Sequence, residues 1–339
     1  MMRTRAAVAI ILVLGAAAVV AYFGWLPVRA NATSSLRHAY ESAHRTDYAG
    51  KVTTTVYYCG REISIRSGIR HNGPEERIEY LSGPLSGVVV VARGGETRTY
   101  RPNTRQILVS RAASRRSEGE ELELLLRNYA VLAAGEGRVA GRPVNIVDLT
   151  SKHPGNPSKR LWIDRETGIV LKSEDRSAAG ELRSRMEFTE ISYGKPAAGA
   201  AFEPTADGGP RWVEKERDHE ISRAELEKAV GIKVAFPQHV PAGYVLDSIT
   251  LYSCECECGH KAAHLRYTDG LNSISIYETP SHTSCSKHIC SIHCAPNGRC
   301  EVRDARQARV ATTSSGGRSV VVVGDLPEEE IAKVAKSIR

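Results

Sequence analysis

The sequence predicts a mostly β protein with two domains, a wide antiparallel sheet followed by a small α+β unit. Alternating apolar and polar runs, separated by turn residues, follow one another from Tyr48 to Tyr193 without the regular helical crossovers of a parallel sheet. A stretch rich in Gly, Ala and Pro, without periodicity, lies between Gly194 and Pro210 and is typical of a linker. A chain of 339 residues also commonly holds two domains.

The centre of the first domain is the segment Leu161–Leu171, with the sequence LWIDRETGIVL. Two β-rich runs flank the turn residues Arg165–Gly168, which predicts an antiparallel hairpin. Further strands are predicted at Gly141–Ser151 and Glu181–Tyr193, so the hairpin becomes part of a meander. We expect an antiparallel sheet of this width to leave one face free to curve around another element.

Residues Met1–Ala32 have the pattern of a targeting segment. Two arginines precede the uncharged run Ala6–Leu26, Pro27 then breaks the helix, and Ala30-Asn31-Ala32 matches the small-x-small pattern of a signal peptidase site. The uncharged run is also long enough to act as an uncleaved inner-membrane anchor. The position of Pro27 favours cleavage, and with either outcome we expect the rest of the chain to be exported to the periplasm.

The first domain, residues 33–194, is predicted to begin with a short helix at Thr33–His44. Strands separated by Gly, Pro and Asn turns are then predicted at Tyr48–Tyr58, Glu62–Ile69, Glu76–Leu81, Val88–Ala92, Thr97–Arg101 and Gln106–Ser110.

A leucine-rich helix is predicted at Glu118–Tyr129, with its acidic residues in the first turns, where they favour the helix dipole. Its stripe of apolar residues contains Leu122, Leu125 and Leu126, and Leu124 lies off the stripe. In a β-rich domain such a helix usually covers or plugs a sheet. We therefore expect Leu122, Leu125 and Leu126 to line a cavity in the sheet that accepts a lipid.

Residues 195–221 are predicted to be the linker, and residues 222–339 the second domain. This domain is predicted to hold helices at Ser222–Val230 and Pro327–Ile338, with strands at Tyr244–Tyr252, Lys261–Tyr267, Ser273–Glu278 and Ser319–Val323.

No enzyme motif is present. The sequence lacks a G-x-S-x-G elbow, a P-loop, a Rossmann fingerprint and an H-E-x-x-H zinc site. Asp164 and Glu166 lie in the predicted hairpin turn, where acidic residues commonly form local hydrogen bonds. The formal net charge of +7 is modest for this length, and no nucleic-acid-binding motif accompanies it. We therefore expect neither catalysis, nor a cofactor, nor nucleic acid binding.

All but one of the eight cysteines lie in an insertion over residues 253–301 of the second domain. Outside the inner membrane, disulfides are the default for such cysteines. A zinc or copper(I) site that adds His260, His288 and His293 is the main alternative, and redox sensing is a third. Their odd number leaves one of them free, paired with the distant Cys59, or bonded to another chain. The seven are Cys254, Cys256, Cys258, Cys285, Cys290, Cys294 and Cys300.

Spacing by two places Cys254, Cys256 and Cys258 on one face of a strand. We therefore expect their disulfide partners to be among the four later cysteines rather than among themselves. The connectivity itself stays open.

Short motifs in both halves resemble the RseB/MucB family of periplasmic regulators of the sigma-E envelope-stress pathway. In the first half the resemblance rests on Val139–Arg142, Leu161–Asp164, Thr167 and Gly168. In the second half it rests on three motifs in the family's order, V-P-A-G-Y (240–244), L-R-Y-T-D-G-L (265–271) and V-G-D-L-P (323–327). The resemblance covers nearly all of residues 33–339, and the cysteine-rich insertion is its one departure from the family pattern.

The resemblance implies a LolA-like first domain, which is a half-open antiparallel β-barrel wrapped around a helix. It also implies a non-enzymatic binder that holds the periplasmic segment of a membrane-spanning anti-sigma factor and shields it from proteolysis. A lipid or lipopolysaccharide signal, sensed by the sheet domain, would release that segment. The alternatives are a periplasmic carrier of lipids or lipoproteins, which would lack the second domain, and a metal-handling protein that uses the insertion. The oligomeric state stays open.

Overall fold

The computed structural model of the chain describes residues 31–43, 45–58, 60–111, 116–194, 213–253, 260–281, 301–305 and 308–339. None of the helices within these ranges is both long and apolar enough to cross a membrane. The predicted targeting segment lies outside the described residues, except for its last two positions.

The described residues of the first domain form eleven strands and two helices. One helix covers residues 31–42. A short 3-10 turn, η1, covers Gly83–Leu85. The remaining elements are β1 (Tyr48–Tyr58), β2 (Arg61–Asn72), β3 (Glu75–Tyr80), β4 (Val89–Arg93), β5 (Glu96–Arg101), β6 (Gln106–Arg111), α2 (Glu118–Asn128), β7 (Tyr129–Val139), β8 (Arg142–Ser151), β9 (Ser158–Asp164), β10 (Val170–Arg176) and β11 (Leu182–Tyr193).

The second domain adds seven strands and two helices to the described structure. They are β12 (Val213–Glu220), α3 (Arg223–Val230), β13 (Val245–Ser253), β14 (Lys261–Thr268), β15 (Ser273–Pro280), β16 (Glu301–Ala305), β17 (Ala308–Ser315), β18 (Arg318–Gly324) and α4 (Glu328–Ser337).

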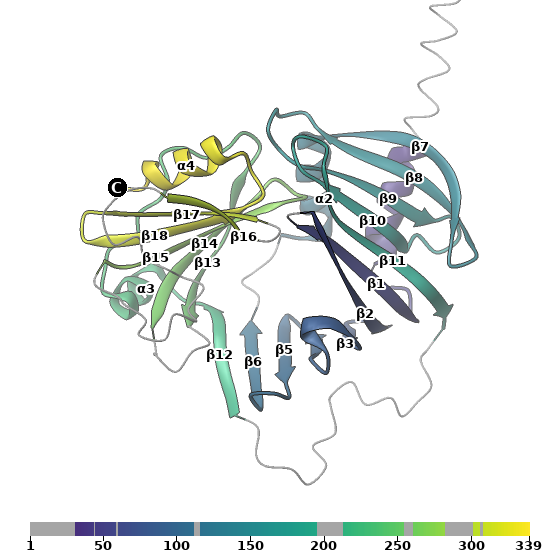
Figure 1. The fold of residues 1–339 in the computed structure, drawn as a ribbon, viewed down its shortest axis with the longest axis horizontal. Helices are drawn as coiled ribbons and strands as arrows, with labels where there is room; N and C mark the ends of the chain where they lie inside the picture. Colours follow the sequence, from purple (N-terminus) through teal and green to yellow (C-terminus); the bar gives the residue numbers. More distant parts are fainter. Residues whose placement is uncertain are drawn as a thin grey trace, which may run out of the picture.

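Backbone hydrogen bonds join the strands of both domains into one series. In the first domain the order is β7-β8-β9-β10-β11-β1-β2-β3-β4-β5-β6. It continues as β12-β13-β14-β15-β18-β17-β16. Each of these pairs is antiparallel, and the parallel pair β6–β12 connects the two parts. Figure 1 shows the series curving from the first domain on the right, through β5, β6 and β12, to the second domain on the left.

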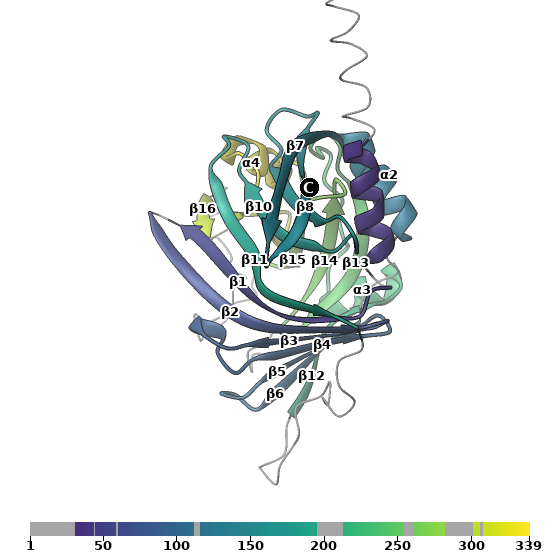
Figure 2. The same ribbon diagram turned by 90° about the vertical axis from the view of Figure 1, so that its right-hand side faces the viewer.

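The first sheet is open, because among the described strands its end strand β7 pairs with β8 and with no other. It curves around the helix over residues 31–42, drawn in purple in Figure 2. Leu36 of that helix is buried in one core cluster with Leu125, Leu149 and Ile163. We call the face of the sheet that packs against this helix the inner face, and the opposite face the outer face. The predicted half-open barrel around a helix, in a mostly β chain, is confirmed.

The central hairpin is also confirmed, and its turn depends on Asp164. This carboxylate is fully buried. It accepts hydrogen bonds from Arg142 Nε at 2.8 Å, Tyr193 Oη at 3.0 Å and the backbone N–H of Glu166 at 2.9 Å. Burial alone would raise the pKa of Asp164, but these bonds hold it below its usual range. Asp164 therefore has the structural role in the turn that its position predicts.

Several sequence predictions need correction. The strand β7 follows α2 directly and was not predicted, because its exposed centre, Ala133–Gly137, consists mostly of small residues. The range 195–221 is not wholly a linker, since residues 213–220 form β12. Strands β16 and β17 were missed as well. The helix predicted at Thr33–His44 already includes residues 31 and 32, and Ala32, assigned to the targeting segment, is only 2% exposed within the first core cluster.

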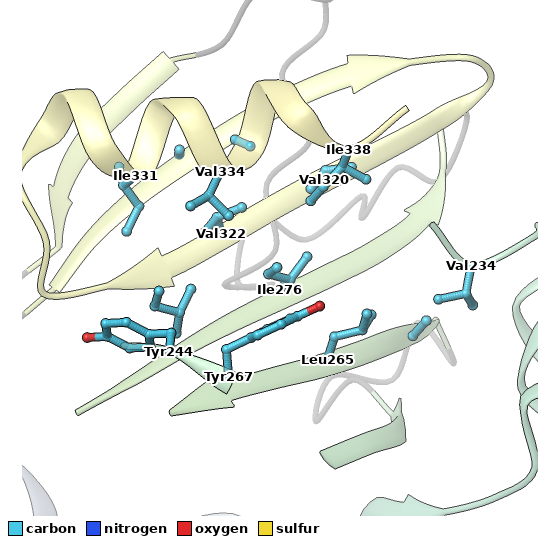
Figure 3. Close-up of a cluster of buried hydrophobic side chains, with 14 of the residues drawn as sticks. Val234, Tyr244, Leu265, Tyr267, Ile276, Val320, Val322, Ile331, Val334 and Ile338 are labelled. Atoms are coloured by element: carbon cyan, nitrogen blue, oxygen red, sulfur yellow. The ribbon is translucent and has the colours of Figure 1, made fainter. Parts of the chain in front are cut away.

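The second domain packs α3 and α4 against one face of its sheet. Figure 3 shows Ile331, Val334 and Ile338 of the C-terminal segment meeting Val320 and Val322 of β18. Each of these side chains is at most 2% exposed. The predicted α+β character is confirmed, although Pro327 lies at the N-cap of α4 rather than inside its first turn.

Candidate functional site at the junction of the two domains

The helix α2 lies between the two domains. Its N-terminus is closed by a capping box, in which Ser117 accepts a bond from the backbone of Glu120 and the Glu120 carboxylate accepts one from the backbone of Ser117. On one face, Leu125 is completely buried in the core of the first domain. Leu124, on another face, is only 4% exposed and borders a hollow shared with the second domain. The helix is therefore buried from both sides.

A buried carboxylate of the second domain, Asp269, meets the end of this helix. Tyr129 Oη donates a hydrogen bond of 2.6 Å to Asp269 Oδ2, and Asn156 Nδ2 lies 3.3 Å from the same oxygen. The backbone N–H groups of Leu271 and Asn272 donate to Asp269 Oδ1 at 2.9 and 2.7 Å. Asp269 has no exposed surface, so these donors take the place of water.

The tyrosines around Asp269 stay protonated. Burial, followed by the negative charge of Asp269, raises the pKa of Tyr129. The same two causes, in the same order, raise the pKa of Tyr244. Because Tyr129 keeps its proton, its hydroxyl can donate to Asp269 while it accepts from Asn272 Nδ2 at 2.8 Å. These bonds position the two domains and do not resemble a proton-transfer site.

Asn128, the last residue of α2, extends the contact to a second segment. Its Nδ2 atom donates to the carbonyl oxygens of Gly243 and Asp269, both at 2.9 Å. Its Oδ1 atom lies 3.0 Å from His153 Nε2. Nearby, Asn156 Nδ2 lies 3.2 Å from the carbonyl oxygen of Ala242. Side chains of the first domain thus bind the backbone of the second.

Two glycines allow the domains to approach this closely. Gly270 has a φ of +93°, and a Cβ atom there would lie 2.6 Å from the backbone nitrogen of Leu125. Gly243 has a φ of +87°, and its Cβ would lie 2.8 Å from Asn128 Oδ1. Both positions need left-handed backbone and the absence of a side chain.

At the other end of the junction, a guanidinium group of the first domain reaches the second sheet. Arg116 donates to Asp247 Oδ1 at 2.9 Å and to the carbonyl oxygen of Leu246 at 2.7 Å. Arg266 Nη1 lies 3.2 Å from Asp247 Oδ2. These groups border a polar hollow of about 250 Å³ between the domains.

The three motifs of the second domain that carry the family resemblance all lie at this junction. The first supplies Ala242 and Gly243, whose carbonyl oxygens accept bonds from the first domain. The second supplies Asp269 and Gly270. The third supplies Pro327, which a Cβ at Gly155 would meet at 3.5 Å. Sequence reasoning recognised these motifs but not that they meet.

The three leucines predicted to line a lipid cavity are packed in the core of the first domain, and their contact with a lipid stays a prediction. Leu125 is fully buried, Leu122 is 6% exposed, and Leu126 packs against the same cluster, which includes Leu36 and Leu149. None of the three is among the lining residues of the hollows at Lys51, at Ala133 and at Arg116. A lipid would have to displace them from the packed core to reach them.

All eight cysteines lie outside the described residues, as do His288 and His293, so the predictions about the insertion stay predictions. His260 is described and is partly exposed. In the described part of the chain no group of three His, Cys, Asp or Glu side chains is placed to hold a metal ion.

Comparisons with known proteins agree in the family that they indicate. Residues 31–206 match the model of the MucB/RseB N-terminal domain. The sigma factor AlgU regulatory protein MucB of Pseudomonas aeruginosa is 28% identical over 222 residues. That match covers 62% of this chain and 60% of MucB, so it spans less than two thirds of that relative.

Solved structures resemble both domains together. The structure of the Pseudomonas aeruginosa MucA/MucB complex has a TM-score of 0.63 at 22% identity, and the match covers 91% of this chain and 98% of that one. A crystal structure of MucB has a TM-score of 0.58 with the same coverage and identity. At this identity the likeness establishes the fold of the two-domain chain.

Proposed function

The chain belongs to the MucB/RseB family, and on that premise we propose that it binds the periplasmic segment of a membrane-spanning anti-sigma factor. The observation that carries the proposal is the junction, where family-type motifs of the second domain contact the first domain. A carrier of lipids or lipoproteins would need the first domain alone. The relative MucB, described as a regulatory protein of the sigma factor AlgU, has been solved in a complex with MucA.

The proposed place of action is the periplasm. The predicted targeting segment supports export, because an uncharged run follows basic residues and precedes a small-x-small pattern. A structure of MucB in complex with a segment named MucA(peri) is consistent with a partner on the same side of the membrane.

We further propose that the inner face of β2–β4 senses a lipid. Ile69, Ile78 and Val90 lie directly opposite one another on neighbouring strands, and each is only partly buried. Ile63 lies on the same face of β2 and is 37% exposed. An acyl chain laid along these side chains would remove apolar surface from water. We call Ile63, Ile69, Ile78 and Val90 the lipid wall. Unlike the buried Leu122 and Leu125, they keep surface that a lipid can reach without displacing the packed core.

Co-elution tests the partner. The purified full chain is mixed with the periplasmic segment of an anti-sigma factor from the same genome and analysed by size-exclusion chromatography. We expect a complex in which the segment resists added protease. If the segment stays free and protease-sensitive while the protein still binds lipid, the carrier alternative is favoured.

A pair of substitutions tests the lipid wall. Ile63→Glu places a charge on the inner face, at a position exposed enough for the fold to tolerate it. Ser64→Glu places the same charge on the outer face, one residue along β2. We expect a fluorescent fatty acid to bind more weakly to the first variant only. Equal binding by both variants contradicts a lipid site on this face.

A further inference from the structure

A hollow of about 510 Å³ lies on the outer face of the first sheet, where β11, β1, β2 and β3 are neighbours. The small residues Gly68 and Ala49 line its floor. Gly68 lies opposite Lys51 across β1 and β2, and Ala49 lies opposite Arg70. A Cβ atom at Gly68 would meet nothing within 4 Å. The hollow is thus open where Gly68 has no side chain.

Two arginines border this hollow in an unusual arrangement. Arg70 of β2 and Arg77 of β3 are directly opposite each other. Their Cα atoms are therefore about 4.5–5.5 Å apart, and like charges in such a pair destabilise a sheet. Arg77 donates to Glu79 at 2.6 Å, and its side chain is 12% exposed. Arg70 has Ala49 as its other cross-strand neighbour, and among the described residues no carboxylate pairs with it.

Other arginines on the outer face have carboxylate partners. Examples are Arg98 with Glu96 at 2.7 Å and Arg160 with Asp148 at 2.6 Å. The exposed Arg66 does not border the hollow, and no carboxylate of the described residues pairs with it, so it serves as a control.

A third cation, Lys51, also borders the hollow. It pairs with Glu190 at 3.0 Å, but the two side chains are 61% and 65% exposed. A pair this exposed contributes little to stability, so Lys51 can turn toward a ligand.

We infer that Arg70, Arg77 and Lys51 form a binding site for a phosphate-type oxyanion. An oxyanion between the two guanidinium groups removes their repulsion and accepts charge-assisted hydrogen bonds from both. Leu81 borders the same hollow and is 46% exposed, so it can contact an apolar part next to the phosphate. The phosphate is either free or part of a lipid headgroup. The oxyanion site lies on the outer face of the sheet and the proposed lipid wall on the inner face. A test can therefore refute one of these two proposals without affecting the other.

The first test uses inorganic phosphate and the full chain. Binding is followed by the melting temperature and by isothermal titration calorimetry, against chloride at equal ionic strength, because exposed charges are screened by salt. We expect phosphate to raise the melting temperature of the wild type. Arg70→Gln should weaken binding roughly tenfold or more, because the charge-assisted bonds of one guanidinium are lost. Arg66→Gln should leave binding unchanged.

Arg70→Gln has a second signature that a merely unfolded variant cannot show. In phosphate-free buffer it should melt at the same or a higher temperature than the wild type, because the repulsion from Arg77 is gone. Gly68→Leu keeps every charge but fills the hollow, and it should also abolish binding. A Cβ atom at this position would contact no atom within 4 Å, so the backbone can accept the first carbon of the new side chain.

The second test uses vesicles of phosphatidylcholine with and without phosphatidylglycerol. If the chain sediments with vesicles only when they contain phosphatidylglycerol, and Arg70→Gln does not sediment, a lipid headgroup is the source of the phosphate. Binding of inorganic phosphate alone supports a free anion. The inference is overturned if neither probe binds, or if Arg66→Gln weakens binding as much as Arg70→Gln does.

Discussion

Tyr129 and Asp269 are 140 residues apart in the sequence, and a hydrogen bond of 2.6 Å joins their side chains across the boundary between the domains. Tyr129 follows α2 directly and belongs to the core of the first domain, whereas Asp269 lies in the loop between β14 and β15. The bond therefore couples the core of one domain to a loop of the other.

Tyr129→Phe should destabilise the chain by about 1–3 kcal/mol, because a buried carboxylate loses a donor and Asn272 loses an acceptor. Urea unfolding measures this change. Tyr40→Phe is the control, since Tyr40 packs against the same core cluster and no hydrogen bond of its hydroxyl is found among the described residues. Equal stability of Tyr129→Phe and wild type would contradict the role assigned to the bond.

Gly270→Ala should loosen the contact between the domains. Its Cβ would lie 2.6 Å from the backbone of Leu125, which cannot give way as a side chain can. Gly317→Ala is the matched control. Its φ of +77° gives an alanine about 1–2 kcal/mol of left-handed backbone strain, but the added Cβ atom would contact nothing within 4 Å. Small-angle X-ray scattering should show a larger radius of gyration for Gly270→Ala only. An unchanged radius in both variants would refute the prediction.

The stability of the second domain should depend on pH through Glu278. Its side chain is fully buried, and burial raises its pKa from 4.5 to about 7. The backbone N–H of Ala235 and the charges of Arg318 and Arg223 oppose this shift, and Glu227 adds to it. As the pH rises from about 4.5 to about 7, the unfolded chain loses this proton first, so the folded state loses stability.

Urea unfolding at pH 5 and pH 8 measures this effect, which we expect to be on the order of 3 kcal/mol for this group. Glu278→Gln removes the titrating proton and should lose less stability over the same interval. Glu329→Gln, at an exposed position of α4, should behave as the wild type. A variant Glu278→Gln with the wild-type dependence on pH would show that another group is responsible.

The cysteines of the insertion are predicted to form disulfides. Its polar sequence has little apolar content to bury, and closing a loop of about 15 residues by a disulfide contributes roughly 3 kcal/mol. Intact mass after alkylation, with and without reductant, should show most of the seven cysteines protected until they are reduced. Five or more thiols reacting without reductant, together with stoichiometric zinc or copper, would establish the metal alternative.

Limited proteolysis tests the proposed division into domains. We expect the first cut within residues 195–212, because β12 from Val213 onward is held by backbone bonds to β6. An early cut inside β12 would contradict this pairing. A first cut inside residues 161–171 would contradict the position of the hairpin at the centre of the sheet.

Local patterns allowed much of the fold to be predicted. The first strand was predicted with its observed limits, since Val52, Thr54 and Val56 alternate with polar residues. The strand β12 was missed because its sequence, VEKERDHE, has no apolar alternation. It is held mainly by backbone bonds to two other strands, which no pattern of side chains reveals.

The junction could not be predicted, for a similar reason. Helical periodicity identified the buried stripe with Leu125 and placed Leu124 off it. Leu124 is nevertheless buried, because its neighbours come from the second domain. Asp269 and Gly270 lie in one of the resemblance motifs, between two predicted strands, and their closeness to α2 follows only from the tertiary arrangement. A resemblance identified the residues but not their shared location.

The strand β12 limits how the two domains can move. Its first residues pair with Gln106–Ser110 of β6, and its last three pair with Thr250–Tyr252 of β13. Two bodies that share a strand cannot twist or slide freely without breaking its backbone bonds. A rotation about an axis along β12 would open the contacts at Asp269 while the strand stays paired to β6 and β13. Such a change in the angle between the domains would be reported by the distance between a label on Tyr129 and a label on Asp269, which are now joined by a hydrogen bond.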